Sequence, residues 1–481
     1  MELLAILTGV IAFVFVFILK HLFMKTNEGG ADNIPGGSMG WPILGETIGY
    51  LKPHKSNSIG TFLEQHCRRY GRVFKSNVFG SPTIISCELE LNTFVLQNEG
   101  RLFQSSYPKP VKNIVGHRSL MIVHGELHKK LRSVEVDFIN SFKSSRRFIG
   151  DIQKLSSSLM ESWKGKQQIH LFQEAKAFSF NVMLKCLFDM APGHPLALKL
   201  FQDFLTFMEG FVSLPLNLPG TTFAKAMKAR RRVASTFKDI LNERGKRKSE
   251  EWGNNGDRIR SGCFADEIVG NDCLKEEEKV SVLFDLLLAG YETTSGLIAL
   301  SAYFLARTPL ALQQLKEEHQ ALRRRKNGEA LTWEDYKQMQ FTPMVINESL
   351  RCGNLVKFVH REAIKDVEFK GYRIPAGWKV LPILSAVNLD PSLHKNPHQF
   401  NPWRWNDPGV SKNVLPFGGG IRICPGAEIG KLEVSILLHY LVQSFRWETK
   451  KDDHPFSYPY LAFKRGLVLD IEHIQLEGNG N

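Results

Sequence analysis

Apolar residues recur at helical spacing over most of this chain, and clusters of proline and glycine interrupt them. Most segments between residues 126 and 306 show this spacing, which predicts a series of helices. Strand-like alternation is confined to the flanks of that region. Residues 62–87 predict a helix that ends at Gly71 followed by a hairpin, and residues 365–381 and 461–471 predict short strands. The pattern therefore predicts a mainly α (α+β) fold with small β-sheets.

The N-terminal segment is apolar in a different way. Residues 3–19 carry no charge, and the apolar run continues to residue 24, which as a helix covers roughly 30 Å, the thickness of a bilayer core. A cleaved signal peptide would have a positive residue before the run and a small-x-small site after it, whereas here Lys20 and Lys25 follow the run. We therefore expect an uncleaved anchor, with the rest of the chain in the cytoplasm.

Composition limits the remaining architecture. The 481 residues contain no internal repeat or low-complexity linker, which favours one large domain or two closely packed lobes. The 33 phenylalanines favour a large apolar interior and an apolar ligand cavity. We therefore expect a membrane anchor in residues 1–25, a Pro/Gly-rich hinge in 26–46 and a catalytic domain in 47–481.

Cysteine and charge usage narrow the class of protein. None of the seven cysteines forms a CxxC pair, which argues against a disulfide framework or a structural zinc site and favours a reducing compartment. The net charge of +13 is spread over separate helical patches without interleaved aromatic residues, so nucleic acid is not the expected partner. The excess suits solvated helix faces or contact with an anionic membrane or an acidic protein.

One glycine-rich loop, "FGGGIRICPGAEIG" at residues 417–430, concentrates candidate chemistry. Its glycines permit close backbone approach, and Cys424 stands just ahead of a predicted helix. A thiolate is a soft ligand for iron, and peptide N–H groups and a helix N-terminus stabilise its charge. On chemistry alone, a buried structural cysteine in a turn is an equal alternative.

The segment 276–308 predicts one long helix with acidic residues in its first turn. A second membrane span is the rival interpretation, but two acidic residues within the apolar run make that costly. Ala289 and Thr293 share a helical face, and the Thr293 hydroxyl can bond to the carbonyl of residue 289, opening a groove for oxygen and water. A threonine at such a place is, in isolation, more often a packing residue.

Two further pairs share helical faces. Glu348 and Arg351 are three residues apart, which in isolation is a common surface pair. His128 and Arg132 are four apart and could point together at an anion. Neither pair by itself indicates a function.

Together these residues carry a resemblance to the cytochrome P-450 superfamily. "FGGGIRICPG" matches the haem-binding pattern F-x-x-G-x-R-x-C-x-G at every defined position. The resemblance, which runs from the anchor to the C-terminus, implies the P-450 fold and a haem b ligated by the Cys424 thiolate. It implies that Phe417 packs by the ring, that Gly418 and Gly426 shape the loop, and that Arg422 pairs with a propionate.

The same resemblance gives roles to the other pairs. Thr293 would assist oxygen activation and Glu292 would relay protons to it. Residues Glu348 and Arg351 would form a fold-supporting network with an arginine of "FNPWRW", where Trp405 replaces the commoner phenylalanine. A histidine replaces the usual tryptophan at position 128, and its N–H can still donate to a propionate. The residues thus implied for the network and the propionates are Arg404, His128, Arg132 and Arg361.

The chain resembles most closely the plant brassinosteroid and sterol hydroxylase clan, through "SLPLNLPGTTFAKAMKARRR" at residues 213–232 and its haem loop. This implies O2-dependent hydroxylation of a sterol, near C-22 of its side chain, at the endoplasmic reticulum membrane, with a single membrane span and a cytoplasmic catalytic domain. Because no GxGxxG follows a strand, NADPH electrons would come through a separate NADPH–cytochrome reductase. By motif position, the candidate substrate-contacting residues are Ile114, Val115, Ala289, Leu355, Val356 and Leu467.

Three alternatives remain at this point. The substrate could be another triterpenoid or isoprenoid of the same clan. A haem-thiolate isomerase or dehydratase would need no reductant, although such enzymes usually lack the acid–threonine pair. A non-catalytic haem sensor would have little use for Thr293 or for the apolar, proline-bounded loop at residues 214–221, which is suited to touching a membrane and gating a lipophilic substrate.

Overall fold

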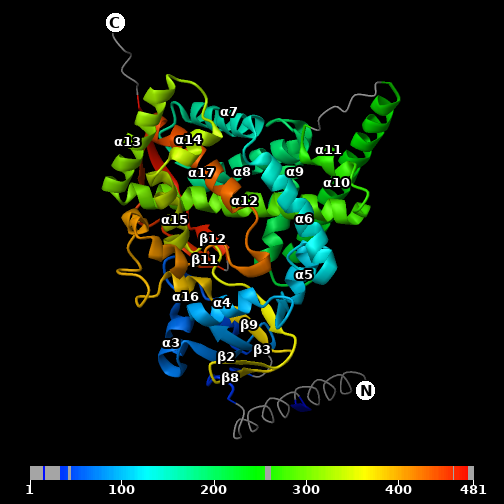
Figure 1. Ribbon diagram of the computed structural model, residues 1–481, viewed down its shortest axis with the longest axis vertical. Helices are drawn as coiled ribbons and strands as arrows, with labels where there is room; N and C mark the ends of the chain where they lie inside the picture. The colour runs from blue at the N-terminus through cyan, green and yellow to red at the C-terminus, as the bar shows by residue number, and fades with distance from the viewer. Residues whose placement is uncertain (1–14, 17–32, 42–44, 255–261, 459, 475–481) are drawn as a thin grey trace.

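The computed structural model describes residues 15–16, 33–41, 45–254, 262–458 and 460–474. A large helical region lies above a smaller region that holds most of the strands (Figure 1). The α-helices are α2 (Thr47–Tyr50), α3 (Thr61–Tyr70), α4 (Leu89–Gln97), α5 (Lys109–Val115), α6 (Gly125–Phe142), α7 (Arg146–Trp163), α8 (Leu171–Phe188), α9 (Pro195–Met208), α10 (Thr222–Asn254), α11 (Phe264–Val269), α12 (Glu276–Ala306), α13 (Pro309–Lys326), α14 (Trp333–Gln338), α15 (Phe341–Gly353), α16 (Leu384–Asn388) and α17 (Ala427–Ser444).

Four sheets accompany the helices. The largest has the order β2-β3-β9-β6-β4, and the others are β10-β13-β5, β1-β11-β12 and β7-β8. The strands are β1 (His54–Lys55), β2 (Val73–Val78), β3 (Ser81–Ser86), β4 (Phe103–Ser105), β5 (Gln168–His170), β6 (Arg361–Ala363), β7 (Val367–Phe369), β8 (Tyr372–Ile374), β9 (Lys379–Pro382), β10 (Phe445–Thr449), β11 (Pro455–Tyr458), β12 (Tyr460–Phe463) and β13 (Val468–His473). Short 3-10 helices are η1 (Glu209–Val212), η2 (Pro402–Asn406), η3 (Pro408–Asn413) and η4 (Gly420–Arg422).

The largest sheet joins distant parts of the chain. The hairpin predicted within residues 62–87 is present as β2 and β3, paired from Val73 opposite Ser86. Its turn lies at Phe79 and Gly80, both with positive φ, and α3 ends at Gly71 as expected. Strand β9 runs parallel to β3, and β6 joins β9 to β4. The sheet therefore brings residues near 103 and residues near 361 into contact.

Helix α12 runs through the middle of the helical region (Figure 1). Its first turn carries three glutamates, and Glu278 Oε2 accepts a hydrogen bond from Lys275 N at 2.9 Å. Among the described residues, α12 is the one helix long and apolar enough to cross a membrane, but 67% of its most apolar window is buried inside the domain. The long helix predicted for residues 276–308 is therefore present as α12, and because α8, α15 and α17 pack against it, it is a core helix of the domain.

The predicted hinge is partly described, and that part is attached to the domain. Ser38 N donates to Lys75 O at 3.2 Å, and Glu46 N donates to Asn77 O at 2.7 Å, so this segment lies along β2. Gly45 has a φ of 58°, and a Cβ there would lie 2.1 Å from Asn77 O, which requires glycine. The predicted anchor lies outside the described residues, apart from residues 15–16.

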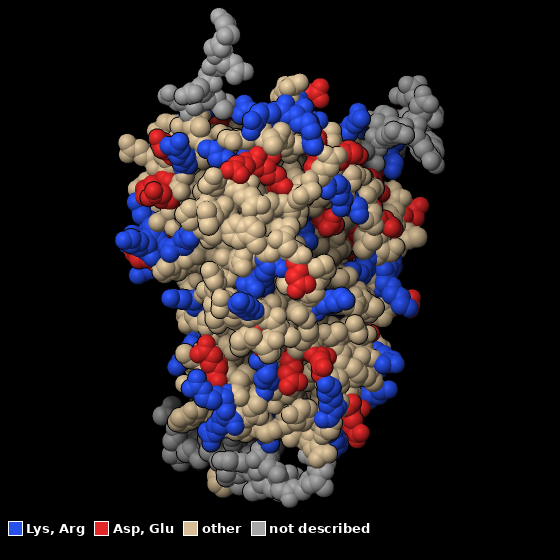
Figure 2. All heavy atoms as spheres, turned by 60° about the vertical axis from the view of Figure 1, so that its left-hand side comes forward, with Lys and Arg blue, Asp and Glu red and all other residues tan. Residues whose placement is uncertain are grey.

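The surface charge is mixed on the face shown in Figure 2. Lysine and arginine side chains of the described chain are interspersed there with aspartate and glutamate. Surface charges of opposite sign also pair directly, as in the ion pair of Lys337 with Glu428, 3.1 Å apart. Exposed pairs of this kind each contribute about 1 kcal/mol or less to stability, so the fold depends mainly on its apolar core.

Candidate active site

The glycine-rich loop presents Cys424 at the start of α17. Cys424 N donates to Phe417 O at 3.0 Å, which closes the loop, and Gly426 is the N-cap residue of α17. Gly420 has a φ of 66°, and a Cβ there would lie 1.9 Å from Leu96 O. This position therefore requires glycine, both for its conformation and for its contact with α4.

The surroundings of Cys424 shift the pKa of its thiol in both directions. Its side chain is exposed, yet the surrounding protein withdraws it from bulk water and raises the pKa of its thiol. A hydrogen bond from the Gly426 backbone and the positive charge of Arg132 act in the other direction. The nearby N-terminus of α17 also stabilises a thiolate, which is the form of cysteine that binds a metal ion.

Two arginines attach this loop to α6 and to the segment before it. Arg132 donates from Nη2 to Ile423 O at 2.6 Å. Arg422 reaches the opposite way and donates from Nη1 to Leu120 O at 2.8 Å and from Nη2 to Val123 O at 2.6 Å. The cysteine loop is therefore bonded both to α6, through Arg132, and to residues 120–123, through Arg422.

A carboxylate outside every sequence motif joins two of the predicted anion-binding residues. Glu99 Oε1 accepts from Arg422 Nε at 2.7 Å, and Glu99 Oε2 lies 2.5 Å from Arg361 Nε. His128 is buried nearby, and its Nε2 atom has no hydrogen-bond partner among the described residues. Burial, followed by the charges of Arg422 and Arg132, lowers the pKa of His128 to about 4. The structure thus gathers His128, Arg361 and Arg422 into one region.

On α12, the predicted hydrogen bond is present. Thr293 Oγ1 donates to Ala289 O at 2.7 Å, and both side chains are exposed, whereas most of the helix is buried. Thr294, the next residue, faces α17, where a Cβ on Gly430 would lie 3.6 Å from Thr294 Oγ1. The Ala289–Thr293 stripe therefore lies next to the place where α12 crosses α17, the helix that follows Cys424.

Glu292 has a partner that the sequence did not indicate. Burial raises the pKa of Glu292, and the charge of Lys176 opposes that rise. Lys176 Nζ lies 3.9 Å from Glu292 Oε2 and 4.4 Å from the centre of the Phe172 ring. Lys176 is on α8, more than one hundred residues earlier in the chain, so only the packing of α8 on α12 reveals the contact.

Glu348 is the centre of a buried network. Arg351 donates to both of its oxygens, at 2.7 and 2.9 Å, and Arg404 Nε donates to Oε1 at 2.9 Å. Trp405 Nε1 adds a bond to Oε2 at 3.0 Å, so the residue that departs from the usual phenylalanine acts as a donor. Burial alone would raise the pKa of Glu348, but the hydrogen bond from Arg351 and the two guanidinium charges hold it below its usual value.

The six candidate substrate residues do not all come together. Ile114 packs beneath η1, where a Cβ on Gly210 would lie 2.9 Å from it, and Val115 beside it is also buried. Leu355 lies against Gly296 of α12, and the neighbouring Val356 is exposed.

Leu467 lies elsewhere. It is fully buried, and its carbonyl accepts from Leu171 N at the start of α8. The C-terminal residue that reaches α12 is instead Leu461 in the β11–β12 hairpin, since a Cβ on Gly296 would lie 3.2 Å from it.

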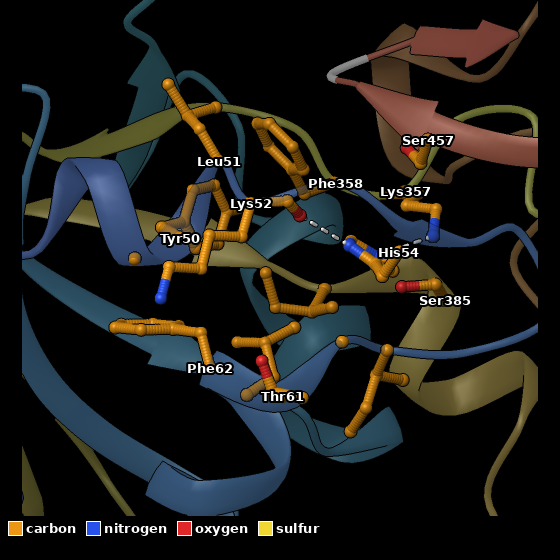
Figure 3. Close-up of a pocket in the computed structure, with 15 residues that line it drawn as sticks. Tyr50, Leu51, Lys52, His54, Thr61, Phe62, Lys357, Phe358, Ser385 and Ser457 are labelled. Carbon is orange, nitrogen blue, oxygen red and sulfur yellow. Dashed lines mark hydrogen bonds between the residues drawn. The ribbon is translucent and has the colours of Figure 1, made fainter.

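A separate cavity lies between α2, α3 and the β11 strand (Figure 3). His54 Nδ1 donates to Lys52 O at 2.9 Å, so its Nε2 atom is free to accept from Lys357 Nζ at 2.8 Å. Burial lowers the pKa of Lys357 to about 7. Tyr50, Phe62 and other residues line this cavity, and none of the predicted site residues does.

The residues around Cys424 fit a haem. They offer a soft sulfur ligand at a helix start, a buried histidine nitrogen without a partner, and three arginines for carboxylates. A Cβ on Gly418 or Gly426 would meet no other atom of the described residues within 4 Å, so both glycines of the loop adjoin open space. Fold and site together fit the class of helix-rich proteins that hold a haem through a cysteine thiolate.

Comparison with known proteins places the chain in a family. The Cytochrome P450 family model matches residues 35–477, and this chain belongs to the cytochrome P450 family. It is therefore a P450 monooxygenase, and the family implies a haem–thiolate cofactor, O2 and electrons from a redox partner.

Individual relatives share most of their length with the chain. It is 47% identical to "Cytochrome P450 724B1" of Oryza sativa subsp. japonica over 98% of this chain and 97% of that one. It is 44% identical to "Cholesterol 22-monohydroxylase CYP90B52" of Paris polyphylla, covering 92% and 94%, and 41% identical to "Steroid (22S)-hydroxylase" of Oryza sativa subsp. japonica, covering 92% and 88%. A solved structure, "Retinoic acid bound cyanobacterial CYP120A1", matches with a TM-score of 0.80 at 24% identity, covering 92% of this chain and all of that one, which establishes the fold.

Proposed function

We propose that this protein hydroxylates a sterol on its side chain near C-22, using O2 and electrons from NADPH delivered by a separate NADPH–cytochrome reductase. The observation that carries the proposal is the identity of 40–44% over most of the chain to relatives named as cholesterol or steroid 22-hydroxylases. The site residues of α12 and of the cysteine loop support the oxidative chemistry.

Cys424 would ligate haem b, and His128, Arg132, Arg361 and Arg422 would hold its propionates. Insertion of one oxygen atom of O2 into an unactivated C–H bond is the chemistry that a thiolate-ligated haem supplies when bound. The remaining work falls to side chains that position groups and move protons.

Thr293 and Glu292 are suited to proton delivery. The Thr293 hydroxyl donates a hydrogen bond to Ala289 O, so its exposed oxygen is left to accept a hydrogen bond from water or substrate. Glu292 is buried, and its raised pKa keeps a proton on the carboxyl over a wider pH range than usual. Glu292, which holds the proton, is therefore adjacent in sequence to Thr293, whose hydroxyl orders the proton acceptor.

An apolar surface loop supports a lipophilic substrate taken from a membrane. Leu214, Leu216 and Leu218, between η1 and α10, are 76%, 51% and 61% exposed. Such a concentration of exposed leucines suits contact with lipid. We propose that the protein is attached to the endoplasmic reticulum membrane through its N-terminal segment, as a single-pass protein with the catalytic domain in the cytoplasm.

Two measurements test the proposal. The reduced carbon monoxide complex should absorb at the Soret position of thiolate ligation, and a histidine-like position would exclude Cys424 as the ligand. With added reductase and NADPH, a panel of sterols should yield a 22-hydroxylated product, identified by mass spectrometry. Product from another isoprenoid alone would support the alternative substrate, and turnover without reductant would support an isomerase or dehydratase.

Docking of the reductase is a second test of the electron source. The chain carries a net charge of +13, which favours contact with an acidic partner. Electron transfer from the reductase should therefore slow as salt rises from about 0.05 to 0.3 M, because screening shortens the Debye length. A rate independent of salt would argue against charge-steered docking.

A further inference from the structure

Glu99 is a buried carboxylate for which neither the family motif nor the proposed chemistry has a role. It follows the C-terminus of α4 and is 8% exposed. Its two oxygens are divided between two arginines, with Arg422 Nε at 2.7 Å from Oε1 and Arg361 Nε at 2.5 Å from Oε2. Ser105 N also donates to Oε1 at 2.9 Å, which fixes the carboxylate to the end of β4.

The three charged residues come from three separate elements. Glu99 lies after α4, Arg361 begins β6 and Arg422 ends η4. Pairing of β4 with β6 sets the position of Arg361, and contact of α4 with η4 sets that of Arg422. Glu99 therefore lies where the sheet meets the cysteine loop.

The geometry of the contacts determines where the outer guanidinium nitrogens point. A guanidinium is planar and rigid, so holding its Nε atom sets the direction of both Nη atoms. Arg361 uses Nη1 on His360 O at 2.9 Å, and Arg422 uses Nη1 and Nη2 on the carbonyls of Leu120 and Val123. One carboxylate thus hydrogen-bonds Arg422 and forms an ion pair with Arg361, whose Nε makes no hydrogen bond within the described residues.

The charges explain why a carboxylate is needed there. Arg361 and Arg422 are buried, or nearly so, with side chains 4% and 11% exposed, and each has Glu99 as its ion-pair partner within the described residues. Two guanidinium groups close together in a protein interior repel one another strongly. Glu99 offsets this repulsion and reduces the net charge of the cluster from +2 to +1.

We propose that Glu99 is a positioning residue for the cofactor, which aligns Arg361 and Arg422 toward the two haem propionates and neutralises one of their charges. The proposal rests on haem binding at Cys424. Without Glu99, the arginines lose their alignment and the region around the propionates becomes more positive by one charge.

The test uses the complete haem-loaded protein and two variants. Glu99→Gln removes the negative charge, and Glu99→Asp keeps the charge while shortening the side chain. Glu362→Gln is the matched control, because Glu362 is the next residue to Arg361 in β6 but binds Ser106 and Lys379 instead. The readouts are the rate of haem transfer to excess apomyoglobin and the midpoint potential of the iron.

Glu99→Gln should transfer haem roughly tenfold faster, since a charge-assisted hydrogen bond contributes about 1.5 kcal/mol or more, and its midpoint potential should rise. Glu99→Asp should also transfer haem faster, with a potential close to that of the wild type. Glu362→Gln should change neither quantity.

Wild-type transfer rate and potential in a folded Glu99→Gln variant would overturn the inference. Should Glu99→Gln not accumulate as folded protein, Glu99→Asp decides, because an unchanged transfer rate in that variant is incompatible with a positioning role. If the wild type itself binds no haem, the proposed function fails rather than this assignment alone.

Discussion

Replacing Trp405 by phenylalanine tests whether the unusual residue of the Glu348 network contributes to stability. Glu348 is fully buried, and its Oε2 atom has two donors, Arg351 Nε at 2.9 Å and Trp405 Nε1 at 3.0 Å. The substitution leaves one donor on that oxygen. A hydrogen bond to a charged group contributes about 1.5–3 kcal/mol, and a buried carboxylate that loses one is not rescued by water.

The neighbouring tryptophan offers a matched control. Trp403 Nε1 donates to Gln314 Oε1 at 2.8 Å, and both tryptophans are partly exposed. Trp403→Phe loses the same ring area and a hydrogen bond to a neutral side chain, which contributes about 0.5–1.5 kcal/mol. The difference between the two variants should therefore be about 1–2 kcal/mol, with Trp405→Phe the less stable.

Thermal inactivation rates are a suitable assay, because a large cofactor-binding protein rarely unfolds in a reversible two-state manner. At one fixed temperature, circular dichroism should show Trp405→Phe unfolding about five- to thirtyfold faster than Trp403→Phe. Equal rates for the two variants would refute the reasoning, since they would mean that the indole N–H contributes nothing to the network.

Three further predictions concern proton delivery and the cavity between α2, α3 and β11. Thr293→Ala should retain NADPH consumption but release more peroxide and less hydroxylated product, and unchanged coupling would remove the role proposed for that hydroxyl. Lys176→Met removes the charge that opposes the raised pKa of Glu292, so if Glu292 delivers protons, the fall of product formation at high pH should move to higher pH; an unmoved profile would contradict this role. Burial lowers the pKa of Lys357 to about 7, so between about pH 7 and 10.4 the unfolded chain binds one more proton than the folded chain, and the stability of the wild type increases over that range. Lys357→Met should therefore raise the unfolding temperature below pH 7 and flatten the increase of the unfolding temperature above pH 7. A pH profile identical to that of the wild type would show that Lys357 is not buried as a cation.

Local patterns were sufficient to predict the elements that carry the haem motif. The helix at residues 276–308 has its acidic first turn and its apolar run within one continuous segment, so periodicity alone locates α12 at Glu276–Ala306. Cys424 is identified by the match of residues 417–426 to the family's haem-binding pattern, since its glycines alone left a structural cysteine as an equal alternative. Both signals lie in neighbouring residues, which is why no knowledge of tertiary contacts was needed.

Partners that approach from distant elements left no such signal. Glu99 stands in an ordinary polar segment, and only the meeting of α4, β6 and η4 gives it two arginines. Lys176 is one of several lysines on helix surfaces until α8 packs on α12.

The prediction for Leu467 shows a related limit. The motif position indicated a C-terminal turn, but Gly466 there packs closely on Gln173 and the β11–β12 hairpin reaches α12 instead. A motif position locates a segment of the chain, whereas the choice between two adjacent turns depends on which of them the sheet directs toward the helix.

The pairing of Glu99 with Arg422 has a consequence for biosynthesis. The two residues are 323 positions apart, so at about 5–20 residues per second the ribosome adds the arginine on the order of tens of seconds after the glutamate. Throughout that interval Glu99 of the nascent chain lacks the arginine of the cysteine loop, and Cys424 is added two residues after Arg422. Pairing of Glu99 with its second arginine and acquisition of the sulfur ligand are therefore nearly simultaneous, and a chain that terminates before this loop keeps only Arg361 as a partner for Glu99 and lacks the sulfur.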